Sequence, residues 1–216
     1  MIKEFHINID DTQIDLLNRK IELTRWPDEI NNKYWSHGTS MSFLKDLSKY
    51  WINDFNWRTH EQALNDIGSY KFSSQSGLDI HFLHAKSNQK NSLPLVMTHG
   101  WPGSIQEFIK VIPLIQEQSD RPIDIICPSL PGFGFSDKPK DLGMNSEQMA
   151  KIQHELIMAL GYKQYIVQGG DWGATVSKWM AELFPQNCIG IHLNLVIAFP
   201  PNTKNPMKGV TDKELK

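Results

Sequence analysis

The chain has little cysteine and no long apolar run, and both shortages exclude whole classes of protein. Its two cysteines, Cys127 and Cys188, each lie within an apolar stretch, and no CxxC or Cys/His spacing suited to a metal is present. We therefore expect buried free thiols, no metal and no other cofactor. No stretch approaches 18 apolar residues, and the N-terminus lacks the basic and apolar segments of a signal peptide. We expect a cytoplasmic protein without contact to a membrane.

An excess of charge of one sign is also missing. The 216 residues contain 22 Lys and Arg against 24 Asp and Glu, a formal net charge of -2, without a cluster of basic residues. Because nucleic-acid binding depends on a basic patch, we exclude a nucleic-acid partner. Hydrophobic residues make up 40% of the chain, which is typical of a globular protein long enough for one buried domain with an attached segment.

Residues 1–75 are expected to form that attached segment, and they contain four of the seven tryptophans. Their apolar positions recur at helical spacing and predict helices over residues 12–24 and 41–55, with the chain broken between them at Pro27. A helical leader of this kind cannot bury its aromatic side chains alone. We therefore expect it to pack on the segment that follows.

From residue 76 the pattern changes to short apolar runs that alternate with helical segments, which indicates the α/β class. Apolar and polar residues alternate over 78–83, which predicts an early antiparallel strand. The later apolar runs are typical of parallel strands buried on both faces, with helices as crossovers. We expect these strands at residues 93–97, 123–127, 165–167 and 188–196, and helices at 104–115 and 146–160, the second capped by Ser146 and ended by Gly161.

A strand, a tight turn and a helix follow one another in residues 165–184. The turn reads Gly169-Gly170-Asp171-Trp172-Gly173, with an acidic residue where the G-x-S-x-G nucleophile elbow carries serine. Glycines two residues before and two after the apex meet a steric need, because the strained turn brings backbone close on both sides. We expect Asp171 to project into a cavity above the sheet as a catalytic nucleophile.

An aspartate at the apex changes the chemistry of the elbow. A carboxyl group with an ordinary pKa of about 4 is ionised at pH 7 and attacks a strained or activated carbon directly, which gives a covalent alkyl ester. A serine would first have to lose its proton to a histidine. The alternative is that Asp171 only caps the next helix through the N–H groups of its first turn.

A second loop, His99-Gly100-Trp101-Pro102-Gly103-Ser104, follows an apolar run where an oxyanion-hole loop belongs. The backbone N–H of Trp101, paired with that of Trp172, would stabilise the oxyanion that forms when water attacks the ester. In the alternative interpretation His99 only hydrogen-bonds the loop, and both tryptophans belong to the core. A third, glycine-rich loop, Pro128–Ser136, follows the next strand and is expected to close the cavity floor. Three such loops in this order favour the catalytic interpretation.

These motifs, together with Leu23-Thr24-Arg25-Trp26-Pro27-Asp28 in the leader, resemble the epoxide hydrolases of the microsomal and juvenile-hormone type, which have the α/β-hydrolase fold. The resemblance covers nearly the whole chain. It implies a small-molecule epoxide as substrate, Asp171 as nucleophile, and an oxyanion and substrate-binding site at Trp101, Trp172, His99 and Gly100. Haloalkane dehalogenases share the elbow and the second loop, so a dehalogenase-like enzyme is an alternative, although the leader favours epoxide hydrolase.

The resemblance also implies a histidine base with an acidic partner, and two lid tyrosines, all located after the strand at residues 188–196. Residues 211–214 have the form of a capping box, yet the sequence ends two residues later. We expect an incomplete α/β-hydrolase domain over residues 76–216, without its last strands and lid, and inactive alone. Its uncovered sheet edge predicts self-association or a complementing C-terminal chain. The alternative is a non-catalytic remnant or binding module.

Overall fold

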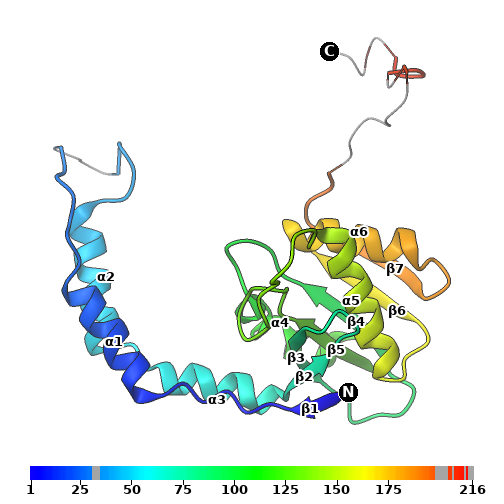
Figure 1. Ribbon diagram of the computed structural model, residues 1–216, viewed down its shortest axis with the longest axis horizontal. Helices are drawn as coiled ribbons and strands as arrows, with labels where there is room; N and C mark the ends of the chain where they lie inside the picture. The colour runs from blue at the N-terminus through cyan, green and yellow to red at the C-terminus, as the bar shows by residue number, and fades with distance from the viewer. Residues whose placement is uncertain (31–34, 198–203, 206, 212, 214–216) are drawn as a thin grey trace. The chain divides into compact units, whose positions relative to one another are not determined.

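Figure 1 shows the computed structural model, which describes residues 1–30, 35–197, 204–205, 207–211 and 213. The chain divides into two compact units. One consists of Met1–Glu4 with Tyr70–Lys216, and the other of Phe5–Ser69. The boundary expected at residue 75 stays a prediction, and the helix start expected at residues 211–214 lies partly outside the described residues.

A sheet of seven strands forms the base of the first unit within the described residues. Its strands are Ile2–Glu4 (β1), Ser69–Ser73 (β2), Asp79–Ala85 (β3), Leu93–Thr98 (β4), Ile123–Pro128 (β5), Tyr165–Gly169 (β6) and Cys188–Leu193 (β7). They lie in the order β1-β2-β3-β5-β4-β6-β7. β1 pairs antiparallel with β2 and β3 pairs antiparallel with β5, whereas β5, β4, β6 and β7 run parallel. The early antiparallel strand and the parallel sheet confirm the predicted α/β class.

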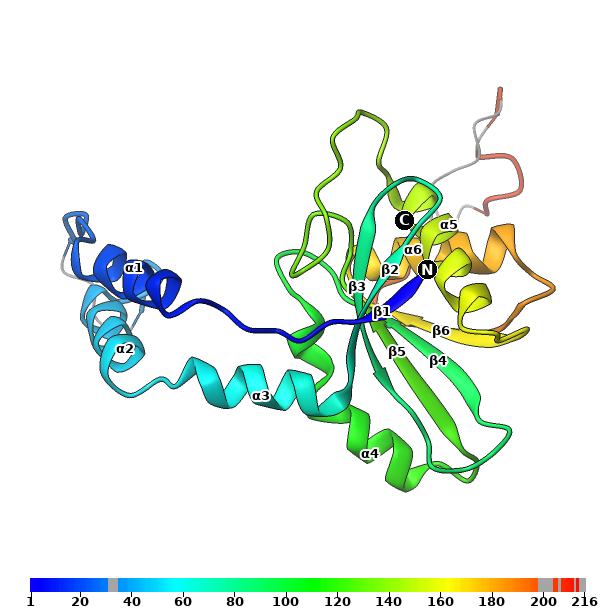
Figure 2. The same cartoon turned by 60° about the horizontal axis from the view of Figure 1, so that its bottom comes forward.

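Helices connect the parallel strands of this sheet. They are α4 (Val111–Gln118) after β4, α5 (Ser146–Ala159) after β5 and α6 (Trp172–Leu183) after β6. Figure 2 shows α4 on one face of the sheet and α5 with α6 on the other. Because β5 and β6 flank β4 on opposite sides, the strand order reverses at β4, the position where open α/β sheets typically bind ligands at the carboxyl ends of their strands. The loops that follow β4, β5 and β6 therefore meet at one edge.

The main core lies between the sheet and the two helices α5 and α6. Phe82, Val96 and Ile126 contribute to it from the strands, Leu156 from α5 and Met180 from α6, all of them buried. Burial of such a side chain stabilises the fold by roughly 1.5–3 kcal/mol. The sheet and these two helices are thus a rigid base for the loops at the carboxyl edge.

The second unit is helical, and hydrogen bonds join its N-terminal segment to its last helix. The backbone N–H of Ile7 donates to Asn65 Oδ1 at 2.8 Å, and the N–H of Ile9 donates to the buried carboxylate of Glu61 at 2.7 Å. These bonds hold the segment before the first helix against the last one. The helices of this unit are Asp11–Glu22 (α1), Met41–Asn53 (α2) and Trp57–Ile67 (α3). α1 and α2 confirm the two predicted helices, whereas α3 was not predicted.

The single helix expected over residues 104–115 is wrong. The structure has a short 3-10 turn at Ile105–Phe108, and α4 begins only at Val111. Pro113 gives the physical reason, because proline lacks the N–H that a helix interior requires and is tolerated in the first turn. The helix therefore begins close enough to Pro113 to keep this residue in its first turn.

Two element ends also differ from their predicted positions. α5 is capped by Asn145, whose side chain accepts the N–H of Gln148 at 3.0 Å, and not by Ser146. The side-chain oxygen of asparagine satisfies the same orphan donors as a serine hydroxyl. β7 ends at Leu193, and Leu195 lies beyond the strand and is exposed. Gly161 follows the end of α5 with a φ of 91°, as a helix-terminating glycine does.

Candidate active site

Asp171 lies between β6 and α6 at the apex of a strained turn. Its φ of 50° and ψ of -128° are rare for a residue with a side chain, and they make the chain reverse within one residue. A Cβ at Gly169 would lie 2.1 Å from the carbonyl oxygen of Gly173, and a Cβ at Gly173 would lie 2.0 Å from that of Thr98. Glycine is therefore required two residues before and two residues after the apex, as the sequence predicted.

The side chain of Asp171 is directed at the neighbouring loop and away from the helix that follows. Its Oδ1 accepts the backbone N–H of Trp101 at 2.7 Å, and it makes no capping bond to α6. The bond to the loop after β4 favours the catalytic interpretation of Asp171 over that of a simple helix cap. The carboxylate is exposed, so the expectation that it projects into a cavity is not met within the described residues.

Two backbone amides keep this carboxylate in its charged form. The N–H of Trp101 and, to a smaller extent, the N–H of Trp172 lower the pKa of Asp171 below its ordinary value, because both stabilise the negative charge. The residue is consequently ionised at neutral pH and needs no base to become nucleophilic.

Gly100 lets the loop after β4 approach this carboxylate. A Cβ at residue 100 would lie 2.4 Å from both Cβ and Oδ1 of Asp171, closer than any non-bonded contact allows. We call the segment His99–Trp101 the oxyanion strap. The strap reaches Asp171 only because residue 100 has no side chain. The side chains of Trp101 and Trp172 are 66% and 56% exposed, so their interpretation as core residues is wrong.

His99 is the first residue of the strap, and it is almost fully buried. Its Nε2 accepts the backbone N–H of Leu130 at 3.1 Å, so Nδ1 carries the proton and donates it to the carbonyl oxygen of Gly100 at 3.0 Å. Burial lowers the pKa of His99, which keeps the ring neutral. Both ring nitrogens are thus occupied in holding two loops together. Sequence reasoning could not find the role of Leu130, because it acts through its main chain.

The glycine-rich loop Pro128–Ser136 is anchored to β3 through a second buried histidine. His81 Nδ1 lies 2.9 Å from Ser129 Oγ, and the backbone N–H of His81 donates to Ser136 Oγ at 2.9 Å. Burial lowers the pKa of His81 to about 3, so this ring is neutral as well. Two neutral histidines, on β3 and after β4, therefore hold the loop beside the strap.

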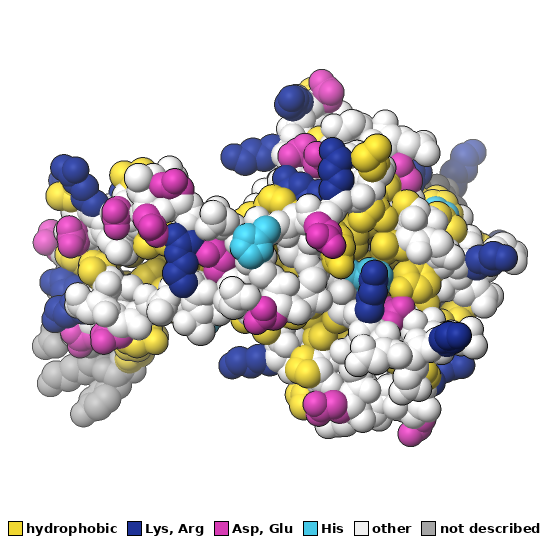
Figure 3. Space-filling view, turned by 90° about the horizontal axis from the view of Figure 1, so that it is seen from below, with side chains coloured by type: hydrophobic (Ala, Val, Ile, Leu, Met, Phe, Trp, Pro, Cys, Tyr) yellow, Lys and Arg dark blue, Asp and Glu magenta, His cyan; other side chains and the backbone are white. Residues whose placement is uncertain are grey.

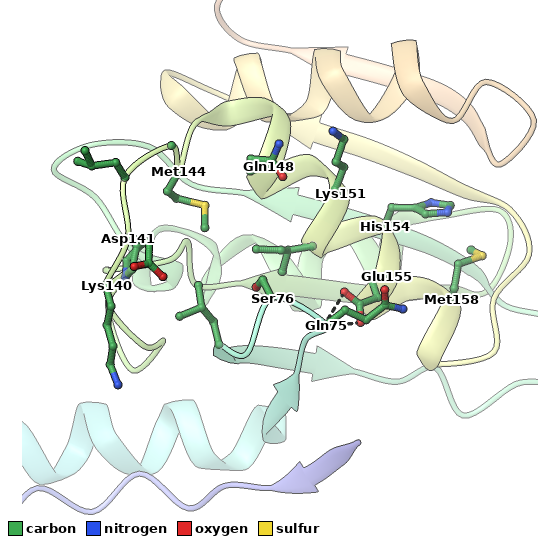
Figure 4. Close-up of a pocket in the computed structure, with 15 residues that line it drawn as sticks. Gln75, Ser76, Lys140, Asp141, Met144, Gln148, Lys151, His154, Glu155 and Met158 are labelled. Carbon is green, nitrogen blue, oxygen red and sulfur yellow. Dashed lines mark hydrogen bonds between the residues drawn. The ribbon is translucent and has the colours of Figure 1, made fainter.

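A cavity lies elsewhere on this unit. Figure 4 shows it between α5, the turn after β2 and the loop before α5, with a volume of about 810 Å³. Leu78, Ile152 and Met144 give it an apolar side, and the carboxylate of Glu155 there accepts the N–H of Gln75 at 2.9 Å. None of the five predicted site residues lines it. The strained elbow, and not this cavity, is the candidate site.

On the face seen in Figure 3, basic and acidic side chains are interspersed, and no broad patch of one sign is visible. Across the described parts of the chain, no group of three His, Cys, Asp or Glu side chains is placed to bind a metal ion. Within those same parts, no helix combines the length and apolar character needed to cross a bilayer.

Two family models match the chain, and their matches overlap over residues 94–108. The model described as "Epoxide hydrolase N terminus" matches residues 2–108, and the model described as "alpha/beta hydrolase fold" matches residues 94–207. The second match contains all five predicted site residues, from the oxyanion strap to Trp172. The chain belongs to the alpha/beta hydrolase fold family.

The relatives that match are named epoxide hydrolases and juvenile hormone epoxide hydrolases, which confirms the resemblance inferred from the sequence. Epoxide hydrolase 1 of Oryctolagus cuniculus is 38% identical over 91% of this chain and 45% of its own length. The crystal structure of juvenile hormone epoxide hydrolase from the silkworm Bombyx mori matches with a TM-score of 0.83 and 37% identity, over 90% of this chain and 53% of that chain. The structure of Aspergillus niger epoxide hydrolase matches with a TM-score of 0.85 and 28% identity, over 100% and 56%. The chain spans about half the length of the curated relatives it matches.

Proposed function

We propose that Asp171 is the nucleophile of an epoxide hydrolase and that it opens a small epoxide to a covalent alkyl ester. The observation that carries this proposal is the bond from the N–H of Trp101 to Oδ1, which leaves Oδ2 of the exposed carboxylate to attack. A new bond forms between Oδ2 and a ring carbon, and the ring C–O bond breaks. Its electron pair stays on the ring oxygen, which takes a proton from solvent and becomes a hydroxyl group.

The same two amides suit the second half of the reaction. When water attacks the ester carbonyl, negative charge develops on Oδ1, the oxygen that accepts the N–H of Trp101, and the N–H of Trp172 also stabilises negative charge on this carboxyl group. Backbone donors preorganised around such an oxygen stabilise the transition state, and removal of one typically costs about 10²–10³ in rate. Trp101 and Trp172 therefore act through their main chains, and Gly100 through the close approach that it permits.

Hydrolysis of the ester also needs a base that takes a proton from water. His99 is next to the strap, but its Nε2 already accepts the N–H of Leu130 and its Nδ1 donates to Gly100. It cannot take this proton while it braces the loops. We therefore propose that the 216-residue chain, when tested alone, forms the ester and accumulates it.

Intact-protein mass spectrometry after incubation with styrene oxide tests this proposal, with Asp171→Asn as the matched control. Asparagine keeps the shape of the side chain and tolerates a positive φ, but it is not a nucleophile. We expect a mass increase of one styrene oxide on the wild type and none at this position on the control. Equal labelling of both proteins, or repeated turnover to the diol by the wild type, would contradict the proposal.

A further inference from the structure

A buried polar layer lies directly beneath the elbow and the strap. Gln153 of α5 is only 2% exposed, and its Oε1 accepts the hydroxyl of Thr98 at 2.9 Å. Its Nε2 has no hydrogen-bond partner among the described residues. The same is true of the hydroxyl of Ser177, which is fully buried on α6. A buried donor without a partner destabilises a fold, so an apolar side chain at residue 153 would stabilise it better.

Thr98, the partner of Gln153, holds a central position in the site. It is the last residue of β4 and immediately precedes the oxyanion strap. It pairs in register with Gly169 of β6. Its carbonyl oxygen packs against Gly173, so closely that a Cβ added at Gly173 would lie only 2.0 Å from it. The main chain of Thr98 therefore contacts the elbow on both sides of Asp171, while its hydroxyl is bonded to α5.

The bond to Gln153 restricts the side-chain torsion of Thr98, whose backbone is already fixed in β4. β4 fixes the backbone of Thr98, and the hydroxyl bond fixes its side chain against α5, which packs against α6 in the main core. The strap begins one residue later and carries the N–H of Trp101 only three residues beyond Thr98. A small rotation at the end of β4 would move this donor away from Oδ1 of Asp171. Reaction rates are sensitive to misplacements of about 1 Å.

We propose that Gln153 is a positioning residue, which acts through Thr98 to hold the Trp101 N–H on Oδ1 of Asp171. Its contribution to catalysis rests on the proposed function of Asp171, whereas its effect on the donor does not. In a purely structural role, the bond from Thr98 to Gln153 would only hold α5 against β4. Loss of that bond would then change the stability of the whole fold without moving the Trp101 amide.

Nuclear magnetic resonance of the ¹⁵N-labelled 216-residue chain separates the two roles. The readouts are the ¹H shift of the Trp101 amide, which is moved downfield by a bond to a carboxylate, and its exchange rate with solvent. Gln153→Met removes the acceptor and the unpaired donor together while it fills a similar volume. Gln153→Glu keeps an acceptor for Thr98, and Ser177→Ala removes the other unpaired group without touching the strap.

We expect Gln153→Met to unfold at the same or a higher denaturant concentration than the wild type, with a Trp101 amide that exchanges at least tenfold faster and moves upfield. Gln153→Glu and Ser177→Ala should retain the wild-type amide. Thr98→Val removes the donor of the same bond and repeats the test if Gln153→Met does not fold. An unchanged Trp101 amide in Gln153→Met or Thr98→Val would overturn the proposal.

The labelling reaction with styrene oxide provides a second readout that links positioning to chemistry. If Asp171 is the nucleophile, the rate of adduct formation should fall at least tenfold in Gln153→Met and recover in Gln153→Glu. If the wild type forms no adduct, the proposed function fails, and the amide shift and exchange rate still decide whether Gln153 positions the strap. An adduct that forms at the wild-type rate in Gln153→Met would contradict the positioning role.

Discussion

The backbone N–H of Trp101 donates a hydrogen bond of 2.7 Å to Oδ1 of Asp171, which lies 70 residues further along the chain. Trp101 follows β4 and Asp171 follows β6, and these strands are parallel neighbours in the sheet. The bond therefore forms only when the two strands pair in the correct register. It makes the geometry of the site a direct consequence of the fold of the first unit.

Replacement of Gly100 by alanine tests the close approach of the strap. The added Cβ would meet Cβ and Oδ1 of Asp171 at 2.4 Å, so the strap must move and carry the Trp101 donor away. We expect the rate of ester formation with styrene oxide to fall by about 10²-fold. Gly190→Ala in β7 is the control, because its Cβ finds only ordinary contacts, at 3.4 Å from Ile166. Labelling of Gly100→Ala at the rate of this control would show that the contact is not needed.

Alanine substitutions at the two glycines before Asp171 test how tightly the elbow is packed. A Cβ at Gly169 would lie 2.1 Å from the carbonyl oxygen of Gly173, whereas a Cβ at Gly170 would lie 3.5 Å from Asn194. We expect Gly169→Ala to lower the free energy of unfolding by ~2 kcal/mol or more, since backbone must shift. Gly170→Ala should stay within about 0.5 kcal/mol of the wild type. Urea titration measures both values, and equal effects would argue against the tight turn.

The first unit should lose stability in mild acid because two of its histidines, His81 and His84, are buried as neutral rings. Burial lowers the pKa of His81 to about 3 and that of His84 to about 4. Both rings take up a proton in the unfolded chain below its ordinary pKa of about 6.5, but not in the folded one. The stabilisation is complete above pH 6.5 and is lost as the pH falls toward 4, by about 1.4 kcal/mol per pH unit for each ring.

Urea unfolding between pH 7.5 and pH 4.5 measures this slope. His81→Gln should make it shallower, because one of the titrating groups is removed. His6→Gln, at an exposed position of the second unit, should leave it as in the wild type. A free energy of unfolding that does not change over this range would contradict the buried, neutral state of both rings.

We expect copies of the chain to associate through the exposed edge of β7. β7 is at the end of the sheet, and its Ile189 and Ile191 are 49% and 45% exposed. An edge strand with exposed apolar residues and no charged side chain is a template for pairing. We expect the mass from light scattering to rise with concentration, and Ile191→Lys to reduce the rise. Gln186→Lys, an exposed position just before β7, adds the same charge as a control. A monomer at all concentrations would contradict the prediction.

The elements that were predicted well are those whose signal is local. The alternation in β3, the apolar runs of β4 to β6 and the glycine pattern around Asp171 each determine the local backbone with little help from other segments. β1 has three residues and forms only by pairing with β2, so no local pattern could reveal it. α3 had local signals that were overlooked, namely the N-cap Asn56 and the terminating Gly68.

The site was predictable to the same degree. The five residues around the elbow were predicted from motif and order, and the structure brings the His99–Trp101 segment against Asp171. The partners that hold them were not found, because Leu130 acts through a backbone N–H and Gln153 lies among the apolar residues of α5. A buried glutamine within an apolar helix face is a signal that a sequence does contain. Its partner, however, depends on the packing of α5 against the end of β4.

The carboxylate of Asp171 is the group that we propose attacks the epoxide carbon. The most direct test is to digest the protein after reaction with styrene oxide and to locate the added mass by tandem mass spectrometry. Free thiols such as Cys188, which is half-buried, are the competing nucleophiles to separate. We predict a base-labile ester on Asp171, absent from Asp171→Asn. Modification confined to cysteine or histidine, with an unmodified Asp171, would contradict the account.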